Sequence, residues 1–312
     1  MRDLKDYVVL YLKGIAMGCA DAVPGVSGGT VAFISGIYEE LVDSIRSFDG
    51  SALNLLFKYD IKGFWKYVNG IFLVVLLSGI GTAILSLSRL ILYWLKTYPE
   101  LLWSFFFGLI IASVLVVTKK ISQWDARIII SGILGAIMGY YITVATPAET
   151  TTALWFVFLS GMISICAMIL PGISGSFILV LLGKYQYVLT AVRDFNLAVI
   201  TIFSTGAVIG ILSFSHLLNW TLRRFHDITI AALTGIMIGS LNKVWPWKKV
   251  METYTNSHGE IKPLIEQNIL PTVYFEATQR DPYLFSAVIL AVIGFALVYF
   301  LEKMSVRVKS EE

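Results

Sequence analysis

Two short stretches carry the residue types and spacing that suit anion binding: "PGVSGGT" from Pro24 and "PGISGS" from Pro171. Proline disrupts a helix interior and glycine permits positive φ, so each stretch ends one helix and lets another begin. A helix N-terminus presents free amide hydrogens and a partial positive charge, which suit an anion. We therefore expect an anion site lined by Ser27, Gly28, Gly29 and Thr30 from the first stretch and by Ser174, Gly175 and Ser176 from the second.

Glycine also serves close helix packing, which is the alternative role for these positions. Packing alone would need neither the prolines nor the clustered hydroxyls, so anion binding is favoured at the two PG motifs. Packing is the expected role of other glycine pairs with a spacing of four, namely Gly135/Gly139, Gly206/Gly210 and Gly235/Gly239.

Three ionisable side chains lie within or beside apolar runs, where charges are costly and usually functional. Asp21 stands three residues before Pro24, and a carboxylate there repels an anion unless it is protonated. Asp21 is therefore either a proton-coupling group or a helix cap. Arg89 and His216 occupy matched places in two apolar runs, so we expect both to contact the anion and His216 to be a second proton-coupling candidate. The alternative for Arg89 is that its side chain extends to the membrane surface.

A charged group follows the first motif and contains Glu39, Glu40 and Arg46. It forms either a gate, for which Glu39 and Arg46 are the candidates, or an ion cluster at the membrane surface. No pattern indicates a catalytic group, a metal site or a cofactor, and the net charge of +3 gives no reason to expect nucleic-acid binding.

The composition indicates which elements must position these residues. The 312-residue chain is 57% hydrophobic and 14% charged, with a mean hydropathy of +0.76, whereas soluble domains carry roughly 25% charged residues. A helix needs about 20 apolar residues to cross a bilayer. Runs that approach or exceed this length include 70–95, 103–118, 128–144 and 283–301. We expect an all-α polytopic membrane protein.

The two motifs belong to an internal repeat. The motif at Pro24 recurs at Pro171, 147 positions later, and "ILSLSRL" from Ile84 recurs as "ILSFSHL" from Ile211, 127 positions later. The offset shrinks because the first copy has an extra polar stretch. The expected first repeat is 1–145, with a broken, re-entrant hairpin at 7–45, a polar insert at 46–69 and helices at 70–145. The second is 153–312, with a hairpin at 153–192, helices at 196–243 and 283–301, and an external loop at 242–282.

Each repeat thus contains a PG-motif hairpin that enters and leaves on one side, followed by three transmembrane helices. An odd number of crossings inserts the second repeat upside down, an arrangement typical of secondary transporters. Lysine and arginine gather at the N-terminus, in 46–66, near 119–127 and 223–224, and at the C-terminus, whereas the 146–153 connection has none. This distribution predicts that both termini are cytoplasmic.

The string "DAVPGVSGGT", the later "PGISGS" and the inverted halves resemble the bacterial polyprenyl-phosphate transporter family, over about residues 13–301. The resemblance implies a multi-pass protein of the bacterial cytoplasmic membrane. It also implies a lipid substrate, undecaprenyl phosphate, which the family is implicated in returning from the outer to the inner leaflet. The residues themselves predict an anion site in a membrane, with membrane lipids as the surroundings. They give no oligomeric state.

Two other functions fit parts of this pattern. Undecaprenyl-diphosphate phosphatases are also inverted-repeat membrane proteins and carry a similar PG-x-S-R-S element, but Gly28 and Gly175 replace its arginine here. Phosphoryl transfer needs fixed cations, and the adjacent Glu39 and Glu40 diverge around a helix instead of forming a pair one turn apart. A small-anion channel or transporter stays open as the third alternative.

Overall fold

The structure, a computed structural model, describes residues 2–23, 26–148, 150–255 and 261–310. Pro24 and Gly25 of the first motif therefore lie outside the described residues, as does the tip of the 242–282 segment at 256–260. The first half contains α1 (Leu4–Asp21), α2 (Gly28–Ile34), α3 (Tyr38–Arg46), α4 (Gly50–Phe57), α5 (Ile61–Tyr67), α6 (Gly70–Thr82), a π-helical turn (Ala83–Leu87), α7 (Ser88–Thr97), α8 (Pro99–Thr118) and α9 (Ala126–Val144).

The second half contains α10 (Leu154–Ile169), α11 (Gly175–Leu181), α12 (Tyr185–Arg193), α13 (Leu197–Arg224), α14 (His226–Ser240), β1 (Lys248–Thr255), β2 (Ile261–Asn268), α15 (Pro271–Thr278) and α16 (Leu284–Ser310). Within the described residues, four helical stretches are long and apolar enough to cross a membrane: Gly70–Leu87, α8, α9 and α13. The pair α11 and α12 qualifies as a fifth if it is taken together, although it is bent by 108°. The expectation of a mostly helical, multi-pass membrane protein is confirmed at this level.

Local backbone chemistry explains where the helices break. The Ser27 side chain caps α2 by accepting a hydrogen bond from the Gly29 amide. Gly36, with φ of +74°, separates α2 from α3, and Gly183, with φ of +62°, separates α11 from α12. Positive φ is strained for residues with a Cβ, so glycine is suited to both bends. Each short helix after a PG motif is therefore followed by a sharp turn and an amphipathic helix.

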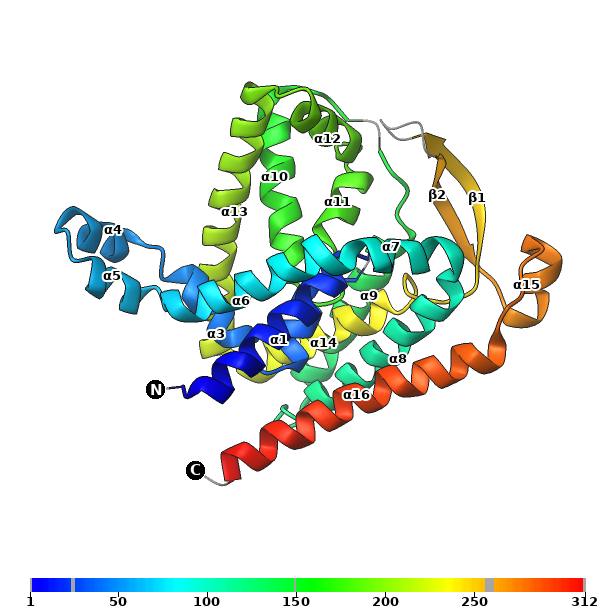
Figure 1. Cartoon of the computed structure of the whole chain (residues 1–312), viewed down its shortest axis with the longest axis horizontal. Coiled ribbons are helices and arrows are strands. Elements are labelled where there is room, and N and C mark those ends of the chain that lie inside the picture. The colour runs from blue at the N-terminus through cyan, green and yellow to red at the C-terminus, as the bar shows by residue number, and fades with distance from the viewer. Residues whose placement is uncertain (1, 24–25, 149, 256–260, 311–312) are drawn as a thin grey trace.

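The apolar helices pack in pairs along small residues. Helix α1 packs against α6, α10 against α13, α8 against α16, and α9 against α14; α8 and α16 run side by side in Figure 1. A Cβ at Gly135 would lie 2.2 Å from the Ala232 carbonyl oxygen, and one at Gly235 would lie 2.0 Å from that of Gly132. Such distances leave no room for a side chain, which confirms the packing role expected for this set of glycines.

Contacts between distant segments define one end of the bundle, which we call the basic end. There α3 meets the start of α1, the end of α13 and the start of α14 through the pairs Arg2–Glu40, Arg223–Asp43 and His226–Glu39. The polar insert forms α4 and α5, which project from this part of the molecule in Figure 1. The Asp49 side chain caps α4 and the Asp60 side chain caps α5.

The segment 242–282, expected to be a loop, contains secondary structure, so the expectation of a purely helical chain is corrected. Strands β1 and β2 form an antiparallel hairpin in which Lys248 pairs with Asn268, and α15 follows. The Trp247 indole donates a 2.9 Å hydrogen bond to the Pro282 carbonyl oxygen, and Tyr274 hydrogen-bonds buried Glu100 of α8. These anchors hold the β hairpin on the helices. Hydropathy over a membrane-length window does not detect such short strands.

Candidate anion site at the hairpin tips

The start of α2 already holds a negative group from the chain itself. The Gly28 amide donates a 2.7 Å hydrogen bond to Asp21 Oδ1, and the Gly29 amide donates a 3.0 Å bond to Ser27 Oγ. A Cβ at Gly28 would lie 2.5 Å from Asp21 Oδ2, so the carboxylate sits directly against the glycine backbone. Of the two roles weighed for Asp21, helix capping is the one present in this geometry.

The tips of the two hairpins lie against each other. Ser27 Oγ donates a 3.0 Å hydrogen bond to the Met168 carbonyl oxygen at the end of α10, and the Gly172 amide donates a 2.8 Å bond to Thr30 Oγ1. A Cβ at Gly29 would lie 2.6 Å from the Ile169 carbonyl oxygen. Ser27 and Thr30 are at most 1% exposed. The polar groups of the first tip are thus buried and partnered, largely by the second hairpin.

The second tip is less fully capped. Ser174 Oγ and Ser176 Oγ are 2.8 Å apart and share a hydrogen bond, and no side chain caps the start of α11. Met168 occupies the position that matches Asp21 in the repeat, so this tip has no equivalent carboxylate. A Cβ at Gly175 would lie 2.5 Å from the Ser164 carbonyl oxygen, which keeps α11 close to α10. The two tips therefore differ in charge although their motifs are alike.

Arg89 and His216 lie away from these buried contacts. Arg89 is exposed on α7, which packs against α8, and His216 is exposed on α13, which packs against α10 and α3. His216 Nδ1 lies 2.8 Å from the Leu212 carbonyl oxygen, so this nitrogen carries the hydrogen and donates it. Within the described part of the chain, neither residue forms a hydrogen bond or ion pair with a tip residue, and a direct role in anion binding stays a prediction.

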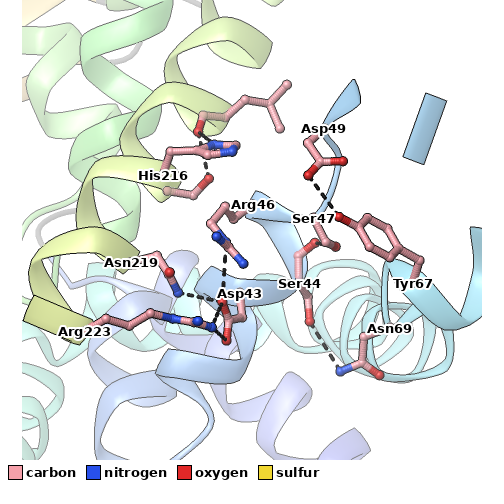
Figure 2. A network of polar contacts seen from close by, with 12 residues as sticks. Asp43, Ser44, Arg46, Ser47, Asp49, Tyr67, Asn69, His216, Asn219 and Arg223 are labelled. Carbon is pink, nitrogen blue, oxygen red and sulfur yellow. Dashed lines mark hydrogen bonds and ion pairs between the residues drawn. The ribbon is translucent and has the colours of Figure 1, made fainter. Parts of the chain in front are cut away.

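The charged group after the first motif forms an ion network between α3 and α13 (Figure 2). Arg46 Nε lies 3.5 Å from Asp43 Oδ1. The same Asp43 carboxylate accepts hydrogen bonds from Asn219 Nδ2 at 2.6 Å and Arg223 Nη2 at 3.1 Å. Glu39 Oε1 lies 3.6 Å from His226 Nε2 at the start of α14. The hydrogen bonds between α3 and α13 thus join residues that are 176 and 180 positions apart in the chain.

Asp43, Asn219 and Arg223 are not among the residues for which the sequence predicts a functional role. Asp43 shares the polar face of the amphipathic helix α3 with Glu39, Glu40 and Arg46, and that spacing is the signal that was present. Its partners on α13 had no comparable signal, because basic residues at the last turn of a helix commonly serve the helix dipole.

A second ion group lies on the β hairpin, outside the membrane-spanning helices. Glu266 Oε2 is 3.2 Å from Lys243 Nζ and 3.6 Å from Lys248 Nζ. Lys248 Nζ also lies 4.1 Å from the centroid of the Trp103 ring. Burial lowers the pKa of Lys248 to about 8. Burial by itself would raise the pKa of Glu266, but the two lysines hold that pKa below its usual value.

Comparisons with known proteins place this chain in a family. Residues 17–262 match the model of the VCA0040-like family, described as undecaprenyl phosphate translocase-like. The chain is 48% identical to a polyprenyl-phosphate transporter of Vibrio cholerae over 298 residues, which cover 96% of this chain and 97% of the relative. It is 31% identical to a polyprenyl-phosphate transporter of Staphylococcus aureus over 75% of this chain and 85% of that relative. No solved structure matches the chain significantly. The coverage, the identity and the family match agree, and the chain belongs to the undecaprenyl phosphate translocase-like family.

Proposed function

We propose that this protein moves polyprenyl phosphate across the bacterial cytoplasmic membrane, from the outer to the inner leaflet, and is not an enzyme. The observation that carries the proposal is the 48% identity over 96% of the chain to a protein named as a polyprenyl-phosphate transporter. The buried polar tips, with amides and hydroxyls at the ends of broken helices, suit the phosphate headgroup. The prenyl tail stays in the surrounding lipid.

The transport mechanism rests on two inverted repeats, 1–145 and 153–312. Matched helix pairs support it, since α1 packs against α6 as α10 packs against α13, and α8 packs against α16 as α14 packs against α9. In this proposal α8 and α14, which contact each other, lie at the pseudo-twofold axis. Transporters with inverted repeats bind substrate where the repeats meet. The contact between the hairpin tips is such a place.

One difference between the halves supports alternating access. Helix α3 packs against α13 of the other half through Asp43 and Arg223. The matched helix α12 packs against α11 and α13, without comparable packing against α6 or α7 in the described part of the chain. We assign the basic end, where α3 lies, to the cytoplasmic side, because lysine and arginine gather on the cytoplasmic side of membrane proteins. The structure then corresponds to a state closed at the cytoplasmic end, in which Glu39 and Arg46 belong to the gate.

The energetic cost of moving the headgroup sets what the site must supply. Burying a bare ion costs several kcal/mol, and each hydrogen bond to a charged group contributes about 1.5–3 kcal/mol. Binding phosphate at the tips requires Ser27 and Thr30 to exchange their bonds to the second hairpin for bonds to the ligand. Arg89, with His216 when protonated, offsets the remaining charge. We expect Arg89→Ala to weaken binding of a phosphate lipid.

A proton completes the scheme, because an inward membrane potential opposes anion entry by about 2.3 kcal/mol per charge per 100 mV. Protonation of Asp21 would neutralise the carboxylate that now holds the Gly28 amide. The amide then becomes available to phosphate, and the proton travels with the lipid. Asp21 is the principal coupling group in this proposal and His216 the second.

The proposal is tested by leaflet exchange of a fluorescent polyprenyl phosphate in liposomes that contain the purified protein. We expect exchange with the native chain, and a loss of at least tenfold in rate with Thr30→Val, which removes the hydroxyl that accepts from Gly172. Thr118→Val is the matched control, since the hydrogen bond that the Thr118 hydroxyl makes among the described residues stays within α8, to the Val114 carbonyl oxygen. Absence of exchange by the native chain would contradict translocation.

The same preparation separates the alternatives. Release of inorganic phosphate from undecaprenyl diphosphate, abolished by Ser27→Ala, would identify a phosphatase. Passage of inorganic phosphate with no leaflet exchange of lipid would identify a small-anion channel.

A further inference from the structure

A pocket separate from the hairpin tips lies between α3 and α13 at the basic end (Figure 2). Its volume is about 430 Å³, and its lining consists of Arg46, His216, Asn219, Trp220, Arg223 and Arg224. Three of these side chains are arginines and none is a carboxylate. Arginine presents a planar fork of N–H donors that matches phosphate geometry. The lining therefore has the composition of a site for an oxyanion.

The charges around the pocket are unbalanced. The carboxylate that borders it, Asp43, faces two guanidinium groups, with Arg223 Nη2 at 3.1 Å and Arg46 Nε at 3.5 Å. Arg224 brings a third positive charge to the same lining. One carboxylate against three arginines leaves an excess of about two positive charges. A phosphate monoester carries roughly −1.5 to −2 at pH 7, which would balance the excess.

The neighbouring carboxylates are engaged elsewhere. Glu40 forms a bidentate ion pair with Arg2, and Glu39 lies 3.6 Å from His226. Asp49 caps α4 and accepts a 3.0 Å hydrogen bond from the Tyr67 hydroxyl. Asp227 accepts from the Ser122 amide at 3.0 Å. Glu39, Glu40 and Asp43 line an adjoining pocket that shares Arg46 and Arg223, and Asp49 interacts electrostatically with His216. Arg224 is therefore the pocket arginine whose charge no carboxylate of the described residues pairs with.

One buried donor in the pocket also lacks a hydrogen bond. Arg46 Nε is buried and makes no hydrogen bond to the described residues, its ion-pair distance to Asp43 being too long for one. Buried donors are nearly always hydrogen-bonded, so a buried guanidinium N–H that has an ion pair but no hydrogen bond leaves room for a further acceptor. Trp220 is 57% exposed beside this donor. Tryptophan at the end of a membrane helix sits at the level of lipid headgroups, which favours a lipid as the source of the phosphate.

We propose that the pocket between α3 and α13 is a second binding site, for a phosphate monoester group carried by a lipid headgroup. Arg46, Arg223 and Arg224 supply the positive charge, and Trp220 covers the lipid side. The inference goes beyond the proposed translocation through the hairpin tips, because no residue of either tip lines this pocket; His216, the second coupling candidate of the proposed function, is the residue that the two proposals share. The inference is tested by ligand binding alone, and the result does not depend on whether the protein exchanges lipid between leaflets.

The test uses purified full-length protein in detergent, with farnesyl phosphate, inorganic phosphate and farnesol as probes. The readout is the part of the tryptophan fluorescence change that is lost in Trp220→Phe. Arg224→Gln removes one pocket charge without touching the Asp43 ion network, and Arg127→Gln removes an exposed arginine at the start of α9 as the matched control. Because one hydrogen bond to a charged group is lost, we expect Arg224→Gln to weaken farnesyl phosphate binding about 10- to 100-fold, and Arg127→Gln less than two-fold.

Each outcome of the binding test either supports or contradicts the proposed pocket site. Binding of farnesyl phosphate that depends on Arg224, with none by farnesol and weaker binding by inorganic phosphate, supports the site and a lipid source. If inorganic phosphate binds as tightly as farnesyl phosphate, and its binding depends on Arg224, the pocket is a phosphate site for a soluble anion. Equal affinities in Arg224→Gln and Arg127→Gln, no response from Trp220, or the same response to farnesol overturns the proposal. Failure of leaflet exchange with this binding intact would contradict the proposed function and leave the pocket site standing.

Discussion

The Asp21 carboxylate accepts a 2.7 Å hydrogen bond from the Gly28 amide, so the first hairpin carries its own anion at the start of α2. A helix start favours a negative group there. The same charge excludes a phosphate from that amide for as long as Asp21 stays ionised. The contact shows the capping role of Asp21, and its coupling role stays a proposal.

We expect Asp21→Asn to leave the hairpin folded but to remove the response of transport to an imposed pH gradient. Asparagine keeps an oxygen that can accept from Gly28, so the cap is preserved while the titrating proton is lost. The measurement is leaflet exchange of polyprenyl phosphate with and without a pH gradient across the liposome. Asn196→Asp serves as a control, since Asn196 caps α13 away from the tips. Full dependence on the gradient in Asp21→Asn would show that Asp21 is not the coupling group.

Gly29→Ala is expected to force the hairpin tips apart. The new Cβ would lie 2.6 Å from the Ile169 carbonyl oxygen, a backbone atom that cannot rotate away. Overpacking of this kind costs about 1–3 kcal/mol, so the apparent melting temperature in detergent should fall and transport with it. Gly81→Ala is the matched control, because nothing lies within 4 Å of a Cβ there, and alanine should be neutral or stabilising. Equal melting temperatures for both variants would contradict close contact of the tips.

Asp43→Asn is expected to loosen the closure between α3 and α13, because the ion pairs with Arg223 and Arg46 lose their negative partner. The pairs are partly exposed, so the effect is at most about 1 kcal/mol, or roughly two- to five-fold in population. The measurement uses a background without native cysteines and a cysteine in place of Ser44, which is 3% exposed. This cysteine should react faster with a membrane-impermeant maleimide when Asp43→Asn is present than when Asp43 is kept. Asp60→Asn removes a carboxylate that caps α5 and is the matched control. The same rate in both variants would exclude Asp43 as part of a gate.

Lys248 makes the stability of the β hairpin dependent on pH. Its pKa is about 8 in the folded protein and about 10.4 when unfolded. Between these values the unfolded state holds the proton that the folded state has lost, so stability rises as pH increases from 8 to about 10.4, by at most about 3 kcal/mol. The protection factors for hydrogen exchange in residues 248–252, which are corrected for the rise of intrinsic exchange with pH, should increase across this window in the native chain. Lys248→Met, which keeps an unbranched side chain without charge, should abolish this increase; if the increase persists, another group titrates.

The sequence by itself determined the properties that depend on neighbouring residues. The apolar runs at 103–118 and 128–144 correspond to α8 and α9, because hydropathy over one helix length reports the cost of burying that segment in lipid. The positions of the breaks follow from backbone chemistry, as the Ser27 cap and the positive φ of Gly36 illustrate. Family membership was also recognisable there, since the motifs lie within the matched residues 17–262.

Tertiary structure alone decided which of these groups meet. The Thr30 hydroxyl accepts from the Gly172 amide across 142 positions, and Asp43 faces Arg223 across 180. Arg89 and His216 occupy matched places in the repeat, yet they lie on helices that pack against different partners. The reason is physical: hydropathy shows that a helix spans, but the rotation and tilt that aim a side chain are set by packing against other helices. Such contacts have no signature in the local sequence, so they emerge only when the helices are assembled.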